Sequence, residues 1–244
     1  MKCLLIDIGN TNVSLGSTIK GELFRAERVP SKNILKSLKG FIKKEKPGAA
    51  VICSVVPPLS KKIRKLLKQK RIKLYECGRE IQIPVKNLYK IPKEVGQDRL
   101  INVYAVNHLY KNVRLVIDLG TALTFDFISK DGEYLGGLIF PGLRVSLAGL
   151  LKDCALLPKK VILKRRHTLY GRSTSECITS GMVLGYSFLI RGLAEHLRKK
   201  KRSFKILITG GDCRLIRNDI ARFDYVQPNL SLKGLGILWK NLAK

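Results

Sequence analysis

The chain alternates short apolar runs with amphipathic segments, which predicts strands and helices in a recurring order. Apolar runs bounded by turn residues are typical of strands, and apolar positions three to four residues apart are typical of helices. In the first half, this pattern predicts strands over residues 2–8, 12–19, 22–29, 49–56 and 72–77, and helices over about 31–45, 57–70 and 94–110. Pro57 and Pro58 end the fourth of these strands.

The second half repeats this order. We expect strands over residues 113–117, 123–129, 134–140, 204–208 and 225–226, and helices over 143–153, over 174–200, after residue 211 and from Leu235. Asp131-Gly132 marks a hairpin between the second and third of these strands. Three antiparallel strands followed by alternating helices and strands, present twice, predict a duplicated α/β fold with a cleft between its halves. The expected domains are residues 1–112 and 113–244.

The composition is typical of a globular protein, because an apolar fraction of 45% suffices for a buried core. No apolar stretch approaches the length of a membrane span, and Met1-Lys2-Cys3 leads directly into the first predicted strand. The six cysteines form no Cys-x-x-Cys pair, so reduced thiols are expected rather than disulfides or a zinc site. We therefore expect a cytoplasmic protein without a membrane segment.

The net charge of +29 is extreme. Lysine and arginine concentrate in residues 61–71 and 198–202, and such charge raises the affinity for polyanions. Leu66, Leu67 and Ile72 accompany the first cluster at positions typical of a buried helix face, and neither cluster contains aromatic residues on which bases would stack. We therefore interpret both clusters as solvated helix surfaces and expect no sequence-specific binding of nucleic acid.

One phrase occurs in both halves: an apolar run that ends in Asp, followed one residue later by Gly and then by small polar residues. The two copies are Asp7-Ile8-Gly9-Asn10-Thr11-Asn12-Val13-Ser14 and Asp118-Leu119-Gly120-Thr121. The glycine permits a tight turn, the carboxylate suits a hydrated cation, and the N–H groups of the turn suit phosphate oxygens. Placed at the start of both halves, the two turns predict a site that grips a nucleotide from two sides.

Two further segments carry candidate chemistry. Thr209-Gly210-Gly211 follows a predicted strand, where paired glycines let the backbone approach a flat ligand, although a plain turn before a helix fits equally well. Gly96-Gln97-Asp98-Arg99 opens a predicted helix. Asp98 there either stabilises the helix N-terminus or, near a nucleotide, acts as a base beside an anion-binding arginine, as phosphoryl transfer requires. No role is assigned to the histidines, which share no local motif: His108, His167 and His196.

Together these segments resemble the actin-like ATPase superfamily, which includes acetate and sugar kinases, and within it type III pantothenate kinase. The matching motifs follow one another over nearly the whole chain. They are Asp7-x-Gly9-Asn10-Thr11, Ser54-Val55-Val56-Pro57, Gly96-x-Asp98-Arg99-x-x-Asn102, Asp118-x-Gly120-Thr121, Gly136-Gly137-x-Ile139-x-Pro141-Gly142, Gly171-x-x-Thr174, Ser180-Gly181 and Thr209-Gly210-Gly211. The resemblance implies a duplicated ribonuclease H-like fold of the actin-like ATPase type.

The resemblance also implies ATP-dependent phosphorylation of pantothenate to 4′-phosphopantothenate, the first step of coenzyme A synthesis, by a homodimer. Asp98 would accept the proton of the substrate hydroxyl, Asp7 would hold hydrated magnesium, and Asp118 would bind the potassium or ammonium ion that the family needs. The implied ATP-binding residues are Asp7, Ile8, Gly9, Asn10, Thr11, Asn12, Val13, Ser14 and Thr121, with Gly210 and Gly211 near adenosine. The implied pantothenate-binding residues are Tyr89, Gly96, Gln97, Asp98, Arg99 and, across the dimer interface, Thr174.

Two positions depart from the family pattern. Gln97 stands where Ala is common, and Leu123 stands where a small or hydroxyl residue is common. Both departures affect the shape of the pocket rather than the reaction. Two other functions are compatible with the same residues. One is a different small-molecule kinase or phosphohydrolase of the superfamily, and the other is a basic, nucleic-acid-binding regulatory protein.

Overall fold

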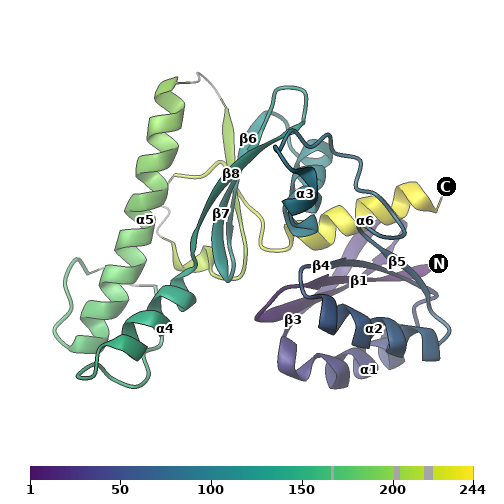
Figure 1. Ribbon diagram of the computed structural model, residues 1–244, viewed down its shortest axis with the longest axis horizontal. Coiled ribbons are helices and arrows are strands. Elements are labelled where there is room, and N and C mark those ends of the chain that lie inside the picture. Colours follow the sequence, from purple (N-terminus) through teal and green to yellow (C-terminus); the bar gives the residue numbers. More distant parts are fainter. Residues whose placement is uncertain (166–167, 201–203, 217–221, 244) are drawn as a thin grey trace. The chain divides into compact units, whose positions relative to one another are not determined.

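The computed structural model describes residues 1–165, 168–200, 204–216 and 222–243, and the chain forms two compact units (Figure 1). Unit 1 comprises Met1–Lys111, Ile128–Gly136 and Asn229–Lys244, and unit 2 comprises Asn112–Phe127 and Gly137–Pro228. His167 and the end of the second basic cluster, residues 201–202, lie outside the described residues.

Unit 1 is built on a five-stranded sheet with the order β3-β2-β1-β4-β5. The strands are β1 (Lys2–Ile8), β2 (Asn12–Ile19), β3 (Glu22–Pro30), β4 (Ala49–Ser54) and β5 (Lys73–Glu76). Strands β1, β2 and β3 are antiparallel neighbours, whereas β4 runs parallel to both β1 and β5. This mixed order confirms the predicted sequence of three antiparallel strands followed by crossover strands.

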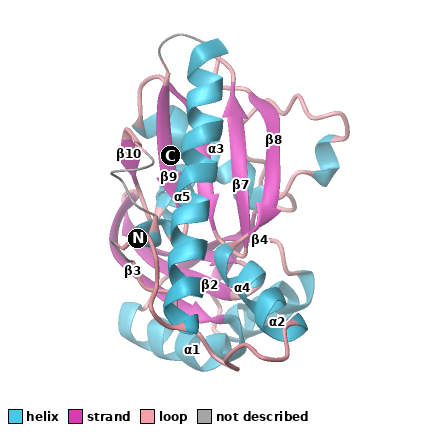
Figure 2. Ribbon diagram, turned by 90° about the vertical axis from the view of Figure 1, so that its left-hand side faces the viewer, coloured by secondary structure: helices cyan, strands magenta, loops and turns pink. Residues whose placement is uncertain are grey.

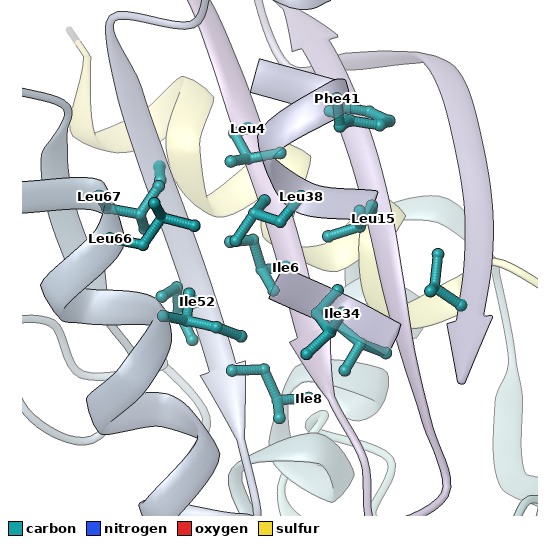
Figure 3. Close-up of a cluster of buried hydrophobic side chains, with 14 of the residues drawn as sticks. Leu4, Ile6, Ile8, Leu15, Ile34, Leu38, Phe41, Ile52, Leu66 and Leu67 are labelled. Carbon is teal, nitrogen blue, oxygen red and sulfur yellow. The ribbon is translucent and has the colours of Figure 1, made fainter. Parts of the chain in front are cut away.

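Helices α1 (Ile34–Glu45) and α2 (Pro57–Gln69) cover one face of this sheet. Alternate residues of β1, namely Leu4, Ile6 and Ile8, point toward them and are fully buried. The same cluster takes in apolar residues of both helices, which Figure 3 shows interleaved with the strand residues: Ile34, Leu38, Phe41, Leu66 and Leu67. Leu66, Leu67 and Ile72 are buried, so the apolar positions within the first basic cluster belong to the core as predicted.

Helices α3 (Gln97–Leu109) and α6 (Leu230–Leu242) belong to unit 1 and pack against each other. Gly234 of α6 lies so close to Ile101 of α3 that a Cβ would approach its carbonyl oxygen within 2.7 Å. Helix α6 begins at Leu230 rather than at the predicted Leu235. Leu230 and Leu232 are buried, and this tertiary packing extends the helix toward its N-terminus.

Unit 2 contains most of a second sheet with the order β10-β9-β6-β7-β8. Its strands are β6 (Val113–Leu119), β7 (Ala122–Ile128), β8 (Tyr134–Pro141), β9 (Lys205–Thr209) and β10 (Tyr225–Val226). Strand β6 is antiparallel to β7 and parallel to β9, as β1 is to β2 and β4. Helices α4 (Leu143–Asp153) and α5 (Thr174–Lys200) pack on this sheet (Figure 2), and the duplication predicted from the sequence is confirmed.

The remaining regular segments are short 3-10 helices: η1 (Ser31–Asn33), η2 (Pro92–Glu94) and η3 (Cys213–Leu215). The division into domains 1–112 and 113–244 stays a prediction from the sequence. In the structure, the hairpin segment Ile128–Gly136 and helix α6 are grouped with unit 1, and α6 packs on β1 and α3. The six cysteines, all of which the structure describes, are free thiols.

Helix α5 is long and apolar enough, by length and composition alone, to cross a membrane. The expectation that no apolar stretch approaches this length therefore does not hold for this segment. Its buried positions recur every three to four residues, at Val183, Ser187, Ile190 and Ala194. This spacing is typical of an amphipathic helix packed on a core, and a single helix that passes such a test is weak evidence for a membrane span.

Candidate active site

The first candidate phosphate turn joins β1 to β2 in unit 1. The Gly9 N–H donates to the Asn12 carbonyl at 3.0 Å, and a Cβ at Gly9 would approach the same oxygen within 3.0 Å. The Ser31 N–H donates to the Thr11 carbonyl at 3.0 Å, which ties the turn to the segment after β3. These contacts make the turn tight and give it a fixed backbone shape.

The implied ATP-binding residues of this turn differ in how far they are exposed to solvent. Asn10 and Thr11 are exposed, while Gly9, Asn12 and Ser14 are half-buried. The side chains of Ile8 and Val13 are fully buried in the unit 1 core. Ile8 and Val13 therefore offer a ligand only their backbone groups.

Asp7 is the penultimate residue of β1 and pairs in register with Ser14 on β2 and Cys53 on β4. The Ser231 hydroxyl, from the first turn of α6, donates to Asp7 Oδ2 at 2.6 Å. Burial raises the pKa of Asp7 to about 6, and the charge of Asp98 acts in the same direction. The Ser231 hydrogen bond and the charge of Arg28 oppose this rise in the pKa. The two carboxylates, Asp7 and Asp98, are thus near enough in unit 1 to interact.

Asp98 lies in the first turn of α3, two residues after the N-cap residue Gly96. Its Oδ1 accepts a hydrogen bond from the Arg99 N–H at 2.9 Å. A Cβ at Gly96 would collide with this oxygen, so a side chain there would displace the Asp98 carboxylate. Burial raises the pKa of Asp98, while the Arg99 N–H and guanidinium lower it. A carboxylate whose pKa is raised toward neutrality is suited to act as a general base.

The rest of the substrate motif forms a cluster of aromatic and polar groups in unit 1. The Arg99 Cζ lies 5.5 Å from the ring centroid of Tyr134, a cation–π distance. The Tyr89 ring lies 6.4 Å from the same ring, centroid to centroid. Gly136 lies beside Tyr89, and its φ of +119 favours glycine although a Cβ there would make only an ordinary contact, at 3.6 Å, with the ring. Gln97 packs against Gly78, where a Cβ would lie 3.0 Å from its amide carbon.

The second copy of the phrase forms the turn from β6 to β7 in unit 2. Asp118 pairs in register with Thr124 on β7 and Thr209 on β9, and the Gly120 N–H donates to the Ala122 carbonyl at 3.0 Å. Gly210 has φ +92, and a Cβ on it would collide with the Asp118 carboxylate. The Thr209-Gly210-Gly211 turn and the Asp118 turn therefore form one continuous surface.

Three further residues of the prediction belong to unit 2. Thr121 is exposed, Gly211 is exposed, and Thr174 is exposed at the first position of α5. Buried Asp212 follows the glycine pair, and its N–H donates to the Leu119 carbonyl at 3.1 Å. Its Oδ1 accepts hydrogen bonds from Arg144, at 3.0 Å from Nε and 2.9 Å from Nη2.

Sequence reasoning missed several side chains of these two half-sites: Ser231, Arg28, Tyr134, Arg144 and Asp212. The sequence pattern predicts a final helix from Leu235, which leaves Ser231 outside it, whereas α6 begins at Leu230. A serine just before an apolar run is a signal for a helix N-terminus, but no local pattern pairs it with a residue of the first strand.

The donor chemistry of both turns fits the implied cations. Among the residues that the structure describes, no group of three or more His, Cys, Asp or Glu side chains could hold a metal ion. Mg²⁺ commonly binds through one or two carboxylates, with water and substrate phosphates as its other ligands. The carboxylate of Asp7 beside a glycine turn meets that requirement. At Asp118, the space that a Cβ on Gly210 would fill adjoins the carboxylate and the Leu119 carbonyl, which are oxygen donors suited to a monovalent cation.

Comparison with protein families gives a match to the model described as type III pantothenate kinase over residues 3–196. A type III pantothenate kinase from Persephonella marina is 36% identical to this chain, with 94% of this chain and 95% of the relative covered. A second, from Syntrophobacter fumaroxidans, is 32% identical over 99% of this chain and 98% of the relative.

Solved structures share the fold. A conserved protein from Campylobacter jejuni, described as a Baf family transcriptional activator, aligns with a TM-score of 0.59 at 20% identity over 98% of both chains. The activator of 2-hydroxyisocaproyl-CoA dehydratase from Clostridium difficile aligns with a TM-score of 0.55 at 10% identity, over 100% of this chain and 96% of that one. The predicted duplicated α/β fold of the actin-like ATPase type is therefore confirmed.

Proposed function

The chain belongs to the type III pantothenate kinase family, and from this premise we propose roles for its residues in the reaction. The protein phosphorylates pantothenate with ATP in the first step of coenzyme A biosynthesis. The observation that supports the proposed roles best is the placement of half-buried Asp98 at the start of α3. There it is held over Gly96 and is near enough to Asp7 for their charges to interact.

Asp98 is the catalytic base. It accepts the proton of the primary hydroxyl of pantothenate as that oxygen forms a bond to the γ-phosphorus of ATP. The bond between this phosphorus and the bridging oxygen breaks, and ADP leaves with the electron pair. Burial raises the pKa of Asp98 and so strengthens it as a base near neutral pH. Phosphoryl transfer needs positioning and charge stabilisation more than covalent chemistry, and the rigid turn at Gly9 provides such positioning.

Asp7 holds hydrated magnesium, and residues 8–14 line the ATP phosphates, with Ile8 and Val13 contributing through their backbone. When bound, magnesium neutralises charge on the phosphate oxygens. In unit 2, Asp118 binds potassium or ammonium, Thr121 contacts ATP, and Gly210 and Gly211 lie near adenosine. The close approach of Gly210 to Asp118 supports this assignment, because only a glycine leaves oxygen atoms of that turn accessible.

Pantothenate is bound by the cluster around Arg99. The Arg99 guanidinium suits the pantothenate carboxylate, and its stacking on Tyr134 limits its conformations. Tyr89, Gly96 and Gln97 supply the other contacts within the protomer. Thr174, exposed at the start of α5, is supplied by the second protomer of a homodimer.

Replacement of Asp98 by asparagine tests the proposed base. The experiment measures pantothenate-dependent ADP formation with magnesium, with and without potassium. We expect Asp98→Asn to lower kcat about 10²- to 10⁴-fold, because general base catalysis contributes that much, while pantothenate still binds. Asp131→Asn is the matched control, since Asp131 is exposed in a hairpin, and it should turn over at the wild-type rate. Unchanged turnover in Asp98→Asn would exclude this residue as the base.

A further inference from the structure

The hydroxyl group of Ser231 lies on the Asp7 carboxylate although the two residues are 224 positions apart. Asp7 is on the opposite face of β1 from Leu4, Ile6 and Ile8, because side chains alternate along a strand. That face is the one on which Leu5 meets α6, as a Cβ on Gly236 would lie 3.7 Å from Leu5 Cδ1. Strand alternation therefore directs the Asp7 carboxylate toward the first turn of α6.

Helix α6 is held in place independently of Ser231. Gly234 is packed on Ile101 of α3, Gly236 is packed on the Gly21 carbonyl, and Asn241 Nδ2 donates to the Tyr104 hydroxyl at 2.9 Å. Ile101 follows Asp98 by nearly one turn of α3. One helix thus contacts both the strand that carries Asp7 and the helix that carries Asp98. The position of Ser231 is consequently fixed by packing rather than by its own hydrogen bond.

We propose that Ser231 is a positioning residue that orients the Asp7 carboxylate for magnesium-bound ATP; this inference depends on the proposed role of Asp7. The 2.6 Å hydrogen bond engages Oδ2 and so leaves Oδ1 to face the water shell of the ion. Groups that orient a metal ligand in this way typically change metal affinity 10- to 100-fold when they are removed.

The surroundings explain why such an orienting group is needed. The Asp7 carboxylate has two oxygen atoms, and the Ser231 hydroxyl holds one of them at 2.6 Å. Ser231 is also in the first turn of α6, where the helix dipole favours a nearby negative charge. The hydroxyl group and the helix end therefore act together on one carboxylate oxygen.

The test compares Ser231→Ala and Ser231→Thr with wild type by calorimetric titration of the full-length chain with ATP. Each titration is carried out with magnesium and again with EDTA, without pantothenate. We expect Ser231→Ala to weaken magnesium-dependent ATP binding about tenfold and to leave ATP binding in EDTA unchanged. The magnesium concentration that gives half-maximal turnover should rise by the same factor of about ten. Ser231→Thr retains a hydroxyl donor and should restore wild-type values.

Ser60→Ala is the matched control. The Ser60 hydroxyl also donates to a carboxylate of unit 1 at 2.6 Å, but its acceptor is Glu76 Oε1, which has no proposed role in the reaction. It should leave magnesium dependence unchanged. Should Ser231→Ala fail to fold, Ser231→Cys keeps the volume with a weak donor and should give an intermediate loss.

Three results would overturn the proposal: wild-type magnesium dependence in Ser231→Ala, an equal loss in EDTA, or no magnesium-dependent ATP binding by wild type. The failure of the proposed function is distinguishable from these. It would appear as intact magnesium-dependent ATP binding without phosphorylation of pantothenate.

Discussion

The two Asp-x-Gly turns share a backbone design but have different surroundings. In each, Asp is the penultimate residue of the first strand of its sheet, and the glycine N–H closes the turn with a 3.0 Å hydrogen bond. Opposite Asp7 on the parallel neighbour stands Cys53, whereas Thr209 stands opposite Asp118. Local structure is therefore repeated, while the residues that face each carboxylate are not.

The difference between the surroundings supports the different roles proposed for the two copies. Asp7 receives the Ser231 hydroxyl and lies in the field of Asp98. Asp118 instead lies against the glycine pair after β9, where a Cβ on Gly210 would meet its carboxylate and the Leu119 carbonyl. A carboxylate beside a hydroxyl and a second acid suits hydrated magnesium near the reaction, and one beside backbone oxygens suits a larger monovalent ion.

Replacement of Asp118 has the largest expected effect and tests whether the two carboxylates have separate roles. We expect Asp118→Asn to lower potassium-stimulated turnover about 10²-fold, as removal of one electrostatic stabiliser does, because the amide has no charge to hold the ion. The half-saturating magnesium concentration should stay at its wild-type value. Turnover measured against potassium and magnesium separately checks this, and a shift in magnesium dependence would show that the two carboxylates share one task.

Replacement of Gly210 tests the packing of the second turn, with a smaller expected effect than replacement of Asp118. Gly210→Ala should destabilise the protein by about 1–3 kcal/mol, because φ is +92 and the new Cβ would collide with Asp118 and the Leu119 backbone. Gly120→Ala is the matched control, since its Cβ would meet only ordinary contacts from 3.5 Å outward. Urea unfolding of both variants measures the difference, and equal stability would contradict the close packing of the two turns.

The smallest expected effect concerns the pH dependence of stability through Asp7. Its pKa is about 6 in the folded state against 3.8 ordinarily, so the folded protein binds the proton more tightly and loses stability as pH rises from about 4 to 6. Asp7→Asn carries no charge and should be more stable than wild type by about 1–2 kcal/mol at pH 8, below the limit of about 3 kcal/mol that this pKa difference sets.

Unfolding in urea with EDTA at pH 8 and pH 4 measures this effect. The gain of Asp7→Asn should vanish at pH 4, where the wild-type carboxyl is largely protonated. The exposed Asp131→Asn control should show no such change between the two pH values. A gain that persisted at pH 4 would mean that the amide stabilises the fold by some means other than removal of a buried charge.

Much of the fold and of the site could be predicted because the signals are local. Apolar runs located the strands of both sheets, and the helix predicted over about residues 94–110 matches α3, which begins three residues later, at Gln97. The N-terminus of α6 was predicted too late, because Leu230 and Leu232 reveal their role only through burial in unit 1. Tyr134 was read as part of a strand, and nothing near it in the sequence points to Arg99.

The sequence alone determined the duplicated strand order, the two tight turns and the position of Asp98 after a glycine. These depend on side-chain period, turn chemistry and glycine conformation, all of which act over a few residues. Only the tertiary structure decided that Asp7 faces Ser231 and that Gly210 lies against Asp118. Such contacts join residues far apart in the chain. They produce no periodic pattern in the sequence, because they arise only when helices and strands pack against one another.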